Sequence, residues 1–339
     1  METSPEPLCQ QYDVAMLDLD GVVYIGPDAV PGAAGHLGEA ASAGMQLAYV
    51  TNNASRPPSA VAEHLRQLDI SVEDGDVVTS AQAAARLVSE KVAPGSSVYV
   101  IGGEGLFEAL ADLGMRPVQD PGDDPVAVVS GYHPDLRWRT VIDGAILVRE
   151  GLPWVASNTD LTVPTRRGPG PGNGVLVRAV AEFAQVEPVV AGKPEPPLFE
   201  ETLRRVGGKR PLVVGDRLDT DIEGAVRTGY DSLLVMTGVT GLAELVSAGP
   251  EARPTYVSAD LGGLMTPLEQ PERDGDGWQL DGWHAEVSGS ELTVEGEGSL
   301  DAWWRVVAAA AWQHLDDAGE PVEIGRLQPP ERGATPDAG

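Results

Sequence analysis

Short apolar runs alternate along the chain, as far as residue 238, with longer stretches in which apolar positions recur at helical spacing. Apolar runs bounded by Gly, Pro or polar residues are typical of buried parallel strands. The pattern predicts strands at 13–19, 46–51, 97–102, 126–131, 153–157, 188–194, 211–216 and 232–238. Helices are predicted between them at 31–44, 57–68, 135–149, 197–206 and 220–228. This alternation indicates an α/β protein built on parallel sheet.

The pattern changes near residue 270. Residues 271–277 (PERDGDG) resemble a linker, and residues 278–295 alternate between polar and apolar as a β-hairpin with a Ser-Gly-Ser turn would. Residues 300–315 predict an amphipathic helix, for which Ser299 is a natural N-cap. We therefore expect a small ββα module at 270–325, and flexible tails at 1–9 and 326–339.

Two pairs of tryptophans lie in this module, at positions 278 and 283 and at positions 303 and 304. A ligand pocket is one interpretation, and a small core that joins hairpin, helix and main domain is the one we favour. The module is too small to be an independent enzyme.

Composition and charge limit the classes of partner. The chain has 339 residues, of which 42% are apolar, so it has room for two domains or two with an appendage. Its net charge of -29 argues against binding nucleic acid or anionic lipid. The single cysteine, Cys9, permits no intrachain disulfide and fits a reducing cytoplasm. We expect neither a signal peptide nor a membrane span, because the sequence has no suitable apolar run.

The first motif with chemical meaning follows the first predicted strand. Asp18 and Asp20 are two positions apart, and Gly21 permits a sharp reversal of the chain directly after them. One carboxylate can act as a nucleophile while its neighbour carries a proton. A metal-binding turn or a solvated loop would use the same residues, so this motif alone is weak.

Two further motifs follow other predicted strands. Thr51, Asn52 and Asn53 offer a hydroxyl and two amides that suit phosphoryl oxygens, although an ordinary helix cap has the same composition. Lys193 stands between Gly192 and Pro194, where one ammonium group can neutralise phosphate and nucleophile charge. A lysine of this kind, taken alone, is more often a surface residue.

The fourth motif is the most informative. The apolar residues 211–214 lead directly into Asp216, Asp219 and Asp221. Carboxylates grouped in this way suit Mg²⁺, which prefers hard oxygen ligands. The alternative is acidic capping of the next helix, for which Asp219 or Thr220 is suited.

Together the four motifs resemble the haloacid dehalogenase (HAD) superfamily of phosphohydrolases. The matching segments are DLDGVVY (18–24), TNNASR (51–56), AGKPEP (191–196) and GDRLDTDI (215–222), which are similar to the type IIA branch. The segment NTDLTVPTRRGPGPGNG (158–174) resembles the cap signature of actinobacterial glycerol 3-phosphate phosphatases. The resemblance covers about residues 12–262 and implies a Rossmann-like HAD core with a parallel sheet, an inserted α/β cap and the ββα appendage.

The resemblance also implies roles. Asp18 would be the nucleophile and a Mg²⁺ ligand, and Asp20 would be the acid and base whose backbone carbonyl also binds Mg²⁺. Thr51 and Asn52, with Asn53 beside them, would hold the phosphoryl group, and Lys193 would orient Asp18. Asp216 would bind Mg²⁺ directly, and Asp221 would do so through a water.

The spacing of the motifs places the cap. Thr51 and Lys193 are 142 positions apart, far more than one crossover needs. We expect the HAD core at 10–80 and 187–265 and the cap at 81–186, where it would exclude phosphoproteins and favour small phosphorylated metabolites. Asp160 and Arg166 are candidate substrate-binding residues of the cap, with a solvated loop as the alternative. His133 and Trp138 are expected to be packing residues.

The best substrate prediction is glycerol 3-phosphate, and the resemblance implies a homodimer. Alternative substrates are 2-phosphoglycolate, pyridoxal 5′-phosphate, a nucleotide or a sugar phosphate, because all present the same phosphoryl group. A phosphotransferase and a catalytically silent binding protein on the same fold are the rival functions.

Overall fold

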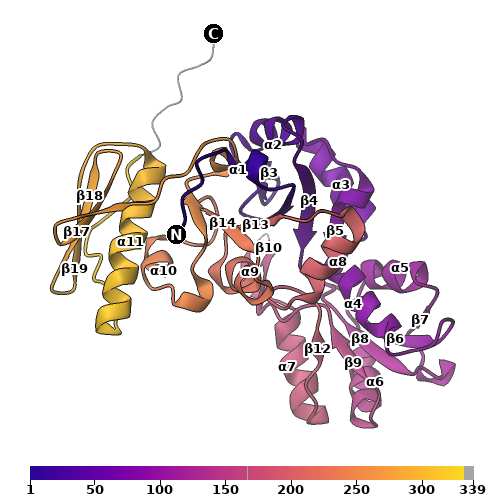
Figure 1. The fold of residues 1–339 in the computed structure, drawn as a ribbon. Coiled ribbons are helices and arrows are strands. Elements are labelled where there is room, and N and C mark those ends of the chain that lie inside the picture. The colour runs from indigo at the N-terminus through magenta and orange to yellow at the C-terminus, as the bar shows by residue number, and fades with distance from the viewer. Residues whose placement is uncertain (166, 332–339) are drawn as a thin grey trace. The chain divides into compact units, whose positions relative to one another are not determined.

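The computed structural model describes residues 1–165 and 167–331, and the chain divides into two compact units (Figure 1). Unit 1 comprises residues 1–46 and 209–339, and unit 2 comprises residues 47–208. Unit 2 is thus inserted into the sequence of unit 1. The finer division into core, cap and C-terminal module at the expected boundaries stays a prediction.

Unit 1 contains a parallel sheet whose strands follow the order β15-β14-β13-β1. The bounds are Val14–Leu17 for β1, Pro211–Gly215 for β13, Asp231–Val235 for β14 and Tyr256–Ser258 for β15. Nearly all of these residues are buried, as their apolar runs predicted. The connecting helices include α2 (Ala33–Ser42), α9 (Glu223–Thr228) and α10 (Leu242–Val246), and β2 (Tyr24–Ile25) pairs with β3 (Asp28–Ala29).

Unit 2 contains a second parallel sheet, in the order β12-β9-β8-β6-β7. Its strands are β6 (Ser97–Ile101), β7 (Arg116–Val118), β8 (Ala127–Ser130), β9 (Trp154–Ala156) and β12 (Val189–Val190). The helices α4 (Ser80–Ser89) and α5 (Glu104–Asp112) pack together, as do α6 (Trp138–Arg149) and α7 (Asn173–Ala184). Apolar side chains of α6 and α7 form a core with Tyr99, Val128 and Trp154 of the sheet.

The remaining elements of unit 2 lie next to its predicted motifs in the sequence. β4 (Gln46–Thr51) pairs in parallel with β5 (Val77–Thr79), and α3 (Pro58–Gln67) connects them. The side-chain oxygen of Thr79 caps α4 by accepting from the Gln82 N–H. β10 (Thr162–Thr165) and β11 (Gly168–Pro171) form a hairpin, and α8 is Pro197–Val206, as predicted.

The C-terminal module contains more strands than expected. An antiparallel sheet of four strands lies against α11 (Leu300–Ala318), as Figure 1 shows. Its strands are β16 (Glu272–Asp274), β17 (Gly277–Leu280), β18 (Trp283–Ser288) and β19 (Glu291–Gly296). The expected linker at 271–277 instead forms β16 and a turn at Gly275. Its polar residues are tolerated there because β16 is an exposed edge strand, which pairs only with β17. Ser299 caps α11 as predicted, by accepting from the Ala302 N–H.

The tryptophans join this module to the parallel sheet of unit 1. Trp303 and Trp304 lie in one buried cluster with Leu234 of β14 and Val257 of β15, and Trp278 and Trp283 pack against that cluster. The predicted joining core is confirmed. The α/β class with a parallel core sheet, a second parallel sheet and a C-terminal sheet with a helix is confirmed as well.

Two expectations were wrong. Residues 1–9 do not form a free tail: Ser4 is buried and forms a bridge with Leu268, and the apolar side chains of Leu8 and Cys9 in α1 (Leu8–Gln11) are buried in the core, while the residues between them are mostly exposed. Trp138 does not pack but is 67% exposed at the start of α6. Within the expected tail at 326–339, residues 332–339 lie outside the described residues.

Candidate active site

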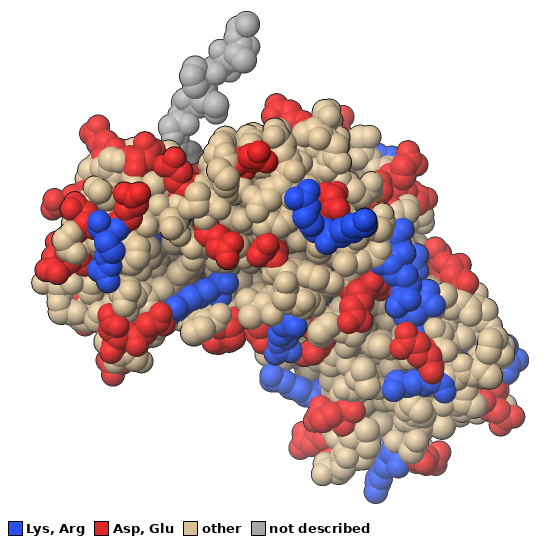
Figure 2. Space-filling view, in the orientation of Figure 1, with Lys and Arg blue, Asp and Glu red and all other residues tan. Residues whose placement is uncertain are grey.

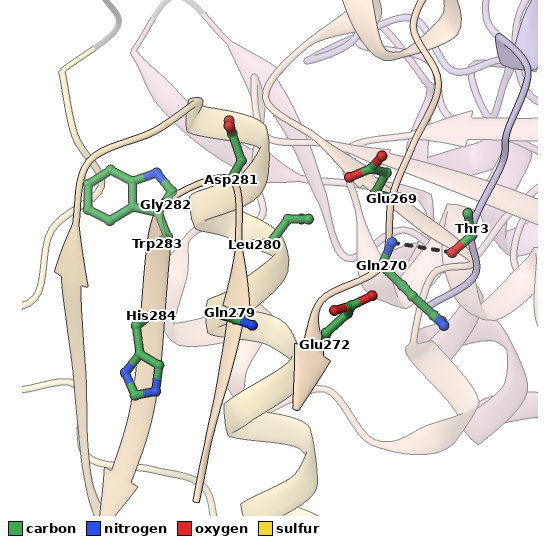
Figure 3. A pocket seen from close by; sticks show the side chains of 10 residues that line it. All are labelled: Thr3, Glu269, Gln270, Glu272, Gln279, Leu280, Asp281, Gly282, Trp283 and His284. Carbon is green, nitrogen blue, oxygen red and sulfur yellow. Dashed lines mark hydrogen bonds between the residues drawn. The ribbon is translucent and has the colours of Figure 1, made fainter. Parts of the chain in front are cut away.

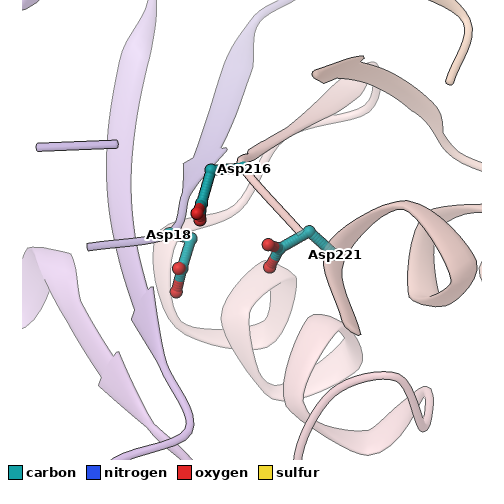
Figure 4. Close-up of side chains that lie close together, drawn as sticks. All are labelled: Asp18, Asp216 and Asp221. Carbon is teal, nitrogen blue, oxygen red and sulfur yellow. The ribbon is translucent and has the colours of Figure 1, made fainter. Parts of the chain in front are cut away.

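Three carboxylates of unit 1 converge at the ends of two neighbouring strands (Figure 4). Asp18 follows β1 and Asp216 follows β13, and these strands pair in parallel with Leu17 opposite Val214. The Asp18 N–H donates to the Val214 carbonyl at 2.8 Å. Asp221 lies in the π-helical turn Leu218–Ile222 that follows. One carboxylate oxygen from each of the three aspartates lies within 4.8 Å of the others.

Backbone groups and glycines hold this acidic triad, defined as Asp18, Asp216 and Asp221. The Val239 N–H donates to Asp216 Oδ2 at 2.6 Å, and the Arg217 N–H donates to Asp221 Oδ2 at 3.2 Å. A Cβ on Gly238 would lie 2.0 Å from Asp216 Oδ2, which is closer than any side chain can approach. Position 238 therefore has to be glycine for the carboxylate to occupy its place.

The triad fits a divalent cation. Asp216 and Asp221 are buried, and three carboxylates at this separation repel one another unless a cation lies between them. Hard oxygen ligands about 2.1 Å from the ion are what Mg²⁺ requires. Asp219, the remaining carboxylate of the motif, does not join the triad, because Arg217 binds both of its oxygens at 3.0 and 2.7 Å.

Asp20 lies two positions after Asp18, and the pKa of its carboxyl group is raised. Desolvation raises the pKa of the Asp20 carboxyl, the negative charge of Asp18 raises it further, and Arg217 opposes both effects. A carboxyl group with a raised pKa holds its proton closer to neutral pH, which suits a group that donates a proton.

In unit 2 the structure brings Lys193 and Asn52 together. Lys193 is only 3% exposed. Asn52 Oδ1 accepts from the Lys193 N–H at 2.8 Å, and Asn52 Nδ2 donates to the Lys193 carbonyl at 3.0 Å. A Cβ on Gly192 would lie 2.5 Å from Asn52 Oδ1, so the glycine before the lysine permits this close approach.

The same carboxamide reaches the candidate substrate-binding residue Asp160. Asn52 Nδ2 lies 3.1 and 3.2 Å from the two oxygens of the Asp160 carboxylate. Asn158 supports both partners, because its Nδ2 donates to the Asn52 carbonyl at 2.6 Å and its Oδ1 accepts from the Asp160 N–H at 3.2 Å. Asn173 Nδ2 donates to the Asn158 carbonyl at 2.7 Å.

The other predicted residues of unit 2 have different surroundings. Thr51 Oγ1 accepts from the Asn53 N–H at 3.1 Å. Asn53 Oδ1 accepts from both the N–H and the hydroxyl of Ser55, at 2.9 and 2.7 Å, so this side chain shapes its own turn. Arg166 lies outside the described residues.

Sequence reasoning missed Asn173. The available signal in the sequence was its place between two glycines, Gly172 and Gly174. In the structure, a Cβ on Gly172 would lie 2.3 Å from the Asp160 carbonyl oxygen, and a Cβ on Gly174 would lie 2.1 Å from the Thr159 carbonyl oxygen. Glycines on both sides of a polar residue indicate a close backbone approach.

Unit 1 has a further pocket, beside the C-terminal sheet, with a volume of about 550 Å³ (Figure 3). Its lining includes Thr3, Glu269, Glu272, Trp283 and His284. It contains none of the predicted site residues. None of the helices in the described ranges combines the length and the apolar character that crossing a membrane requires.

Comparison with known proteins agrees with the geometry. The family model of haloacid dehalogenase-like hydrolases matches residues 15–116, and an HAD-hydrolase-like model matches residues 190–264. A D-glycerol 3-phosphate phosphatase of Mycobacterium tuberculosis is 40% identical over 321 residues, which cover 90% of this chain and 87% of that protein. An acid sugar phosphatase of Staphylococcus aureus is 35% identical over 263 residues, which cover 77% of this chain and 100% of that protein.

A solved structure is also similar. The crystal structure of a glycerol phosphate phosphatase from Mycobacterium tuberculosis in complex with magnesium has a TM-score of 0.82 and 40% identity, and the match covers 91% of this chain and 92% of that one. The relatives are thus similar in sequence along most of the chain and similar in fold. With these likenesses and its strand-end motifs, the chain belongs to the haloacid dehalogenase-like hydrolases and is a phosphatase of that superfamily.

Proposed function

We propose that this enzyme hydrolyses small phosphate monoesters through a phosphorylated Asp18, with glycerol 3-phosphate as its best substrate. The observation that carries the chemistry is the convergence of Asp18 with Asp216 and Asp221 at the ends of paired strands. The 40% identity to a D-glycerol 3-phosphate phosphatase supports the substrate. The 35% identity to an acid sugar phosphatase makes sugar phosphates the second candidate.

The proposed reaction has two steps. In the first, an Asp18 oxygen attacks phosphorus, the bond from phosphorus to the alcohol oxygen breaks, and Asp20 gives its proton to the departing oxygen. In the second, Asp20 takes a proton from water, the water oxygen attacks phosphorus, and the bond to Asp18 breaks to release phosphate. The raised pKa of Asp20 supports its role in both proton transfers.

The other residues bind and orient. Asp18, Asp216, Asp221 and the Asp20 carbonyl are the proposed Mg²⁺ ligands, with Asp221 acting through a water. The ion would neutralise charge on the phosphoryl oxygens. Thr51 and Lys193 of unit 2 are proposed to bind the phosphoryl group, and Asp160 and Arg166 the alcohol part. Location in the cytoplasm and a homodimer stay predictions of the sequence.

The test is phosphate release from a panel of esters with Mg²⁺. Glycerol 3-phosphate is compared with 2-phosphoglycolate, pyridoxal 5′-phosphate, a nucleoside monophosphate and a sugar phosphate. We expect the highest kcat/KM for glycerol 3-phosphate and no release from any ester by Asp18→Asn. A higher kcat/KM for another ester would change the proposed substrate without changing the proposed chemistry. Activity that survives in Asp18→Asn would refute the phosphorylated aspartate.

A further inference from the structure

Three arginines of unit 2 converge on one buried glutamate. Glu201, on α8, is only 1% exposed. Its Oε1 lies 2.8 Å from Arg205 Nε, and its Oε2 lies 3.2 Å from both Arg86 Nε on α4 and Arg204 Nε on α8. Figure 2 shows Lys and Arg side chains gathered over the region where Figure 1 places α8.

The cluster carries more positive charge than the glutamate needs. One guanidinium group, with a charge of +1, balances the charge of one carboxylate. Three guanidinium groups around one carboxylate leave a surplus of two positive charges. The chain has only 23 basic residues against 52 acidic ones, so a surplus of this size at one place runs against the charge of the whole molecule.

The arginines contact Glu201 through Nε, which leaves their terminal amino groups available. Within the described part of the chain, these amino groups donate no hydrogen bond to another residue. The side chains of Arg86, Arg204 and Arg205 are 30%, 55% and 33% exposed, so their outer ends reach solvent. Glu201 thus fixes the inner edge of each guanidinium group while the outer edge stays accessible.

We propose that Arg86, Arg204 and Arg205 form a binding site for a phosphate-class dianion. A phosphate group carries a charge of about -1.5 to -2 near neutral pH, which matches the surplus of the cluster. The planar guanidinium fork binds two phosphate oxygens at once. Inorganic phosphate and a phosphate monoester share this chemistry.

The site is separate from the proposed catalytic residues of unit 2. Lys193 precedes the first residue of α8 by four positions, whereas Arg204 and Arg205 lie in the last turn of that helix. A helix of ten residues is about 15 Å long. The proposal therefore does not depend on the proposed function. Its rival is a structural cluster that fastens α4 to α8 and binds no ligand.

The experiment is isothermal titration calorimetry of the full chain at low ionic strength with EDTA. Inorganic phosphate is titrated in one arm and glycerol 3-phosphate in the other, since no ester should be hydrolysed without metal. The variant Arg204→Gln/Arg205→Gln is compared with the wild type. The control is Arg139→Gln/Arg149→Gln on α6, which removes the same charge from the same unit.

We expect Arg204→Gln/Arg205→Gln to lose one phosphate site, with Kd raised at least about tenfold, because each lost charged hydrogen bond has an effect of that order. The control should keep the site. The compound with the lower Kd, inorganic phosphate or glycerol 3-phosphate, shows whether the site prefers the free ion or the ester. Equal stoichiometry and Kd in the wild type and the α8 variant would overturn the proposal.

Two single variants guard against misfolding of the double variant. Arg86→Gln leaves α8 unchanged and should also weaken phosphate binding. Glu201→Gln raises the surplus from two charges to three and should tighten phosphate binding at low salt, an effect that added salt removes. A structural cluster would lose thermal stability in both variants and change phosphate affinity in neither, and that result would contradict the proposal.

Discussion

The carboxamide of Asn52 forms hydrogen bonds with both the N–H and the carbonyl of Lys193. Its oxygen accepts from the Lys193 N–H at 2.8 Å, and its nitrogen donates to the Lys193 carbonyl at 3.0 Å. The same nitrogen lies 3.1 Å from an oxygen of the Asp160 carboxylate. The Asn52 side chain therefore has its partners within the protein, and we infer that its main effect is to position Lys193.

We predict that Asn52→Ala lowers kcat about 100-fold, because a displacement of about 1 Å at a catalytic group can have an effect of that size. Steady-state kinetics on glycerol 3-phosphate or another ester that the enzyme accepts would measure it. The double variant Asn52→Ala/Lys193→Ala should be no slower than Lys193→Ala alone, since the positioning effect vanishes once the lysine is absent.

The control is Asn53→Ala, which removes a carboxamide that binds Ser55 and does not reach Lys193 in the described contacts. Its effect should add to that of Lys193→Ala instead of disappearing. Additive effects of Asn52→Ala and Lys193→Ala would show that Asn52 does not act through the lysine.

The sequence predicted the acidic triad because strand ends are predictable. An apolar run that stops at an aspartate fixes where the side chain emerges, and parallel pairing then brings two such ends together, as for Asp18 and Asp216. Asp221 follows within one turn. These relationships need only local pattern and the rule that parallel strands end at the same edge.

The sequence did not predict which partner each polar residue has. Asn52 and Asn53 are identical in type and adjacent, yet one binds Lys193 and the other binds Ser55. That choice depends on contacts across 141 positions of sequence, which no local pattern contains. The exposure of Trp138 and the pairing of β16 are likewise set by what surrounds them in the fold.

We predict that Mg²⁺ raises the melting temperature of unit 1, and that EDTA reverses this. Binding to the folded state alone stabilises it, by about 2.7 kcal/mol at a concentration of 100 times Kd. Asp216→Asn should abolish the Mg²⁺-dependent shift. It should not lower the melting temperature without metal, because it removes one of three charges that repel one another.

Asp219→Asn is the matched control in differential scanning fluorimetry. Its carboxylate binds Arg217 outside the triad, so the Mg²⁺-dependent shift should persist. An Asp216→Asn variant that still responds to Mg²⁺ as the wild type does would place the metal elsewhere.

The C-terminal module should contribute to the stability of unit 1. Trp303 is 2% exposed and packs in the cluster with Leu234 and Val257, whereas Trp138 is 67% exposed. Trp303→Ala should lower the free energy of unfolding by about 3–5 kcal/mol. Trp138→Ala, the same change at an exposed position, should lower it by less than about 0.5 kcal/mol. Urea unfolding compares the two, and equal losses would mean that the module does not share a core with the parallel sheet.

The link between Asp281 and Ser299 should make the module sensitive to acid. The Ser299 N–H donates to Asp281 Oδ2 at 2.9 Å, and this bond, with a further one from the Ser299 side chain, lowers the pKa of the Asp281 carboxyl. Because the pKa is lower in the folded state, ionised Asp281 contributes stability at any pH above its unfolded value of about 3.9. That contribution is lost as the pH falls through the folded value.

Asp281→Asn should therefore have a lower melting temperature than the wild type at pH 7, and the difference should shrink as the pH falls through the lowered pKa of the folded Asp281 carboxyl. Asp112→Asn, a change of an exposed aspartate at the end of α5, is the control for the removal of one negative charge. If the loss in Asp281→Asn stays the same as the pH is lowered from 7 until the wild-type carboxyl is protonated, the hydrogen bonds do not depend on the charge of Asp281. The loss would then come from the geometry of the turn between β17 and β18, which a neutral amide would disturb at any pH.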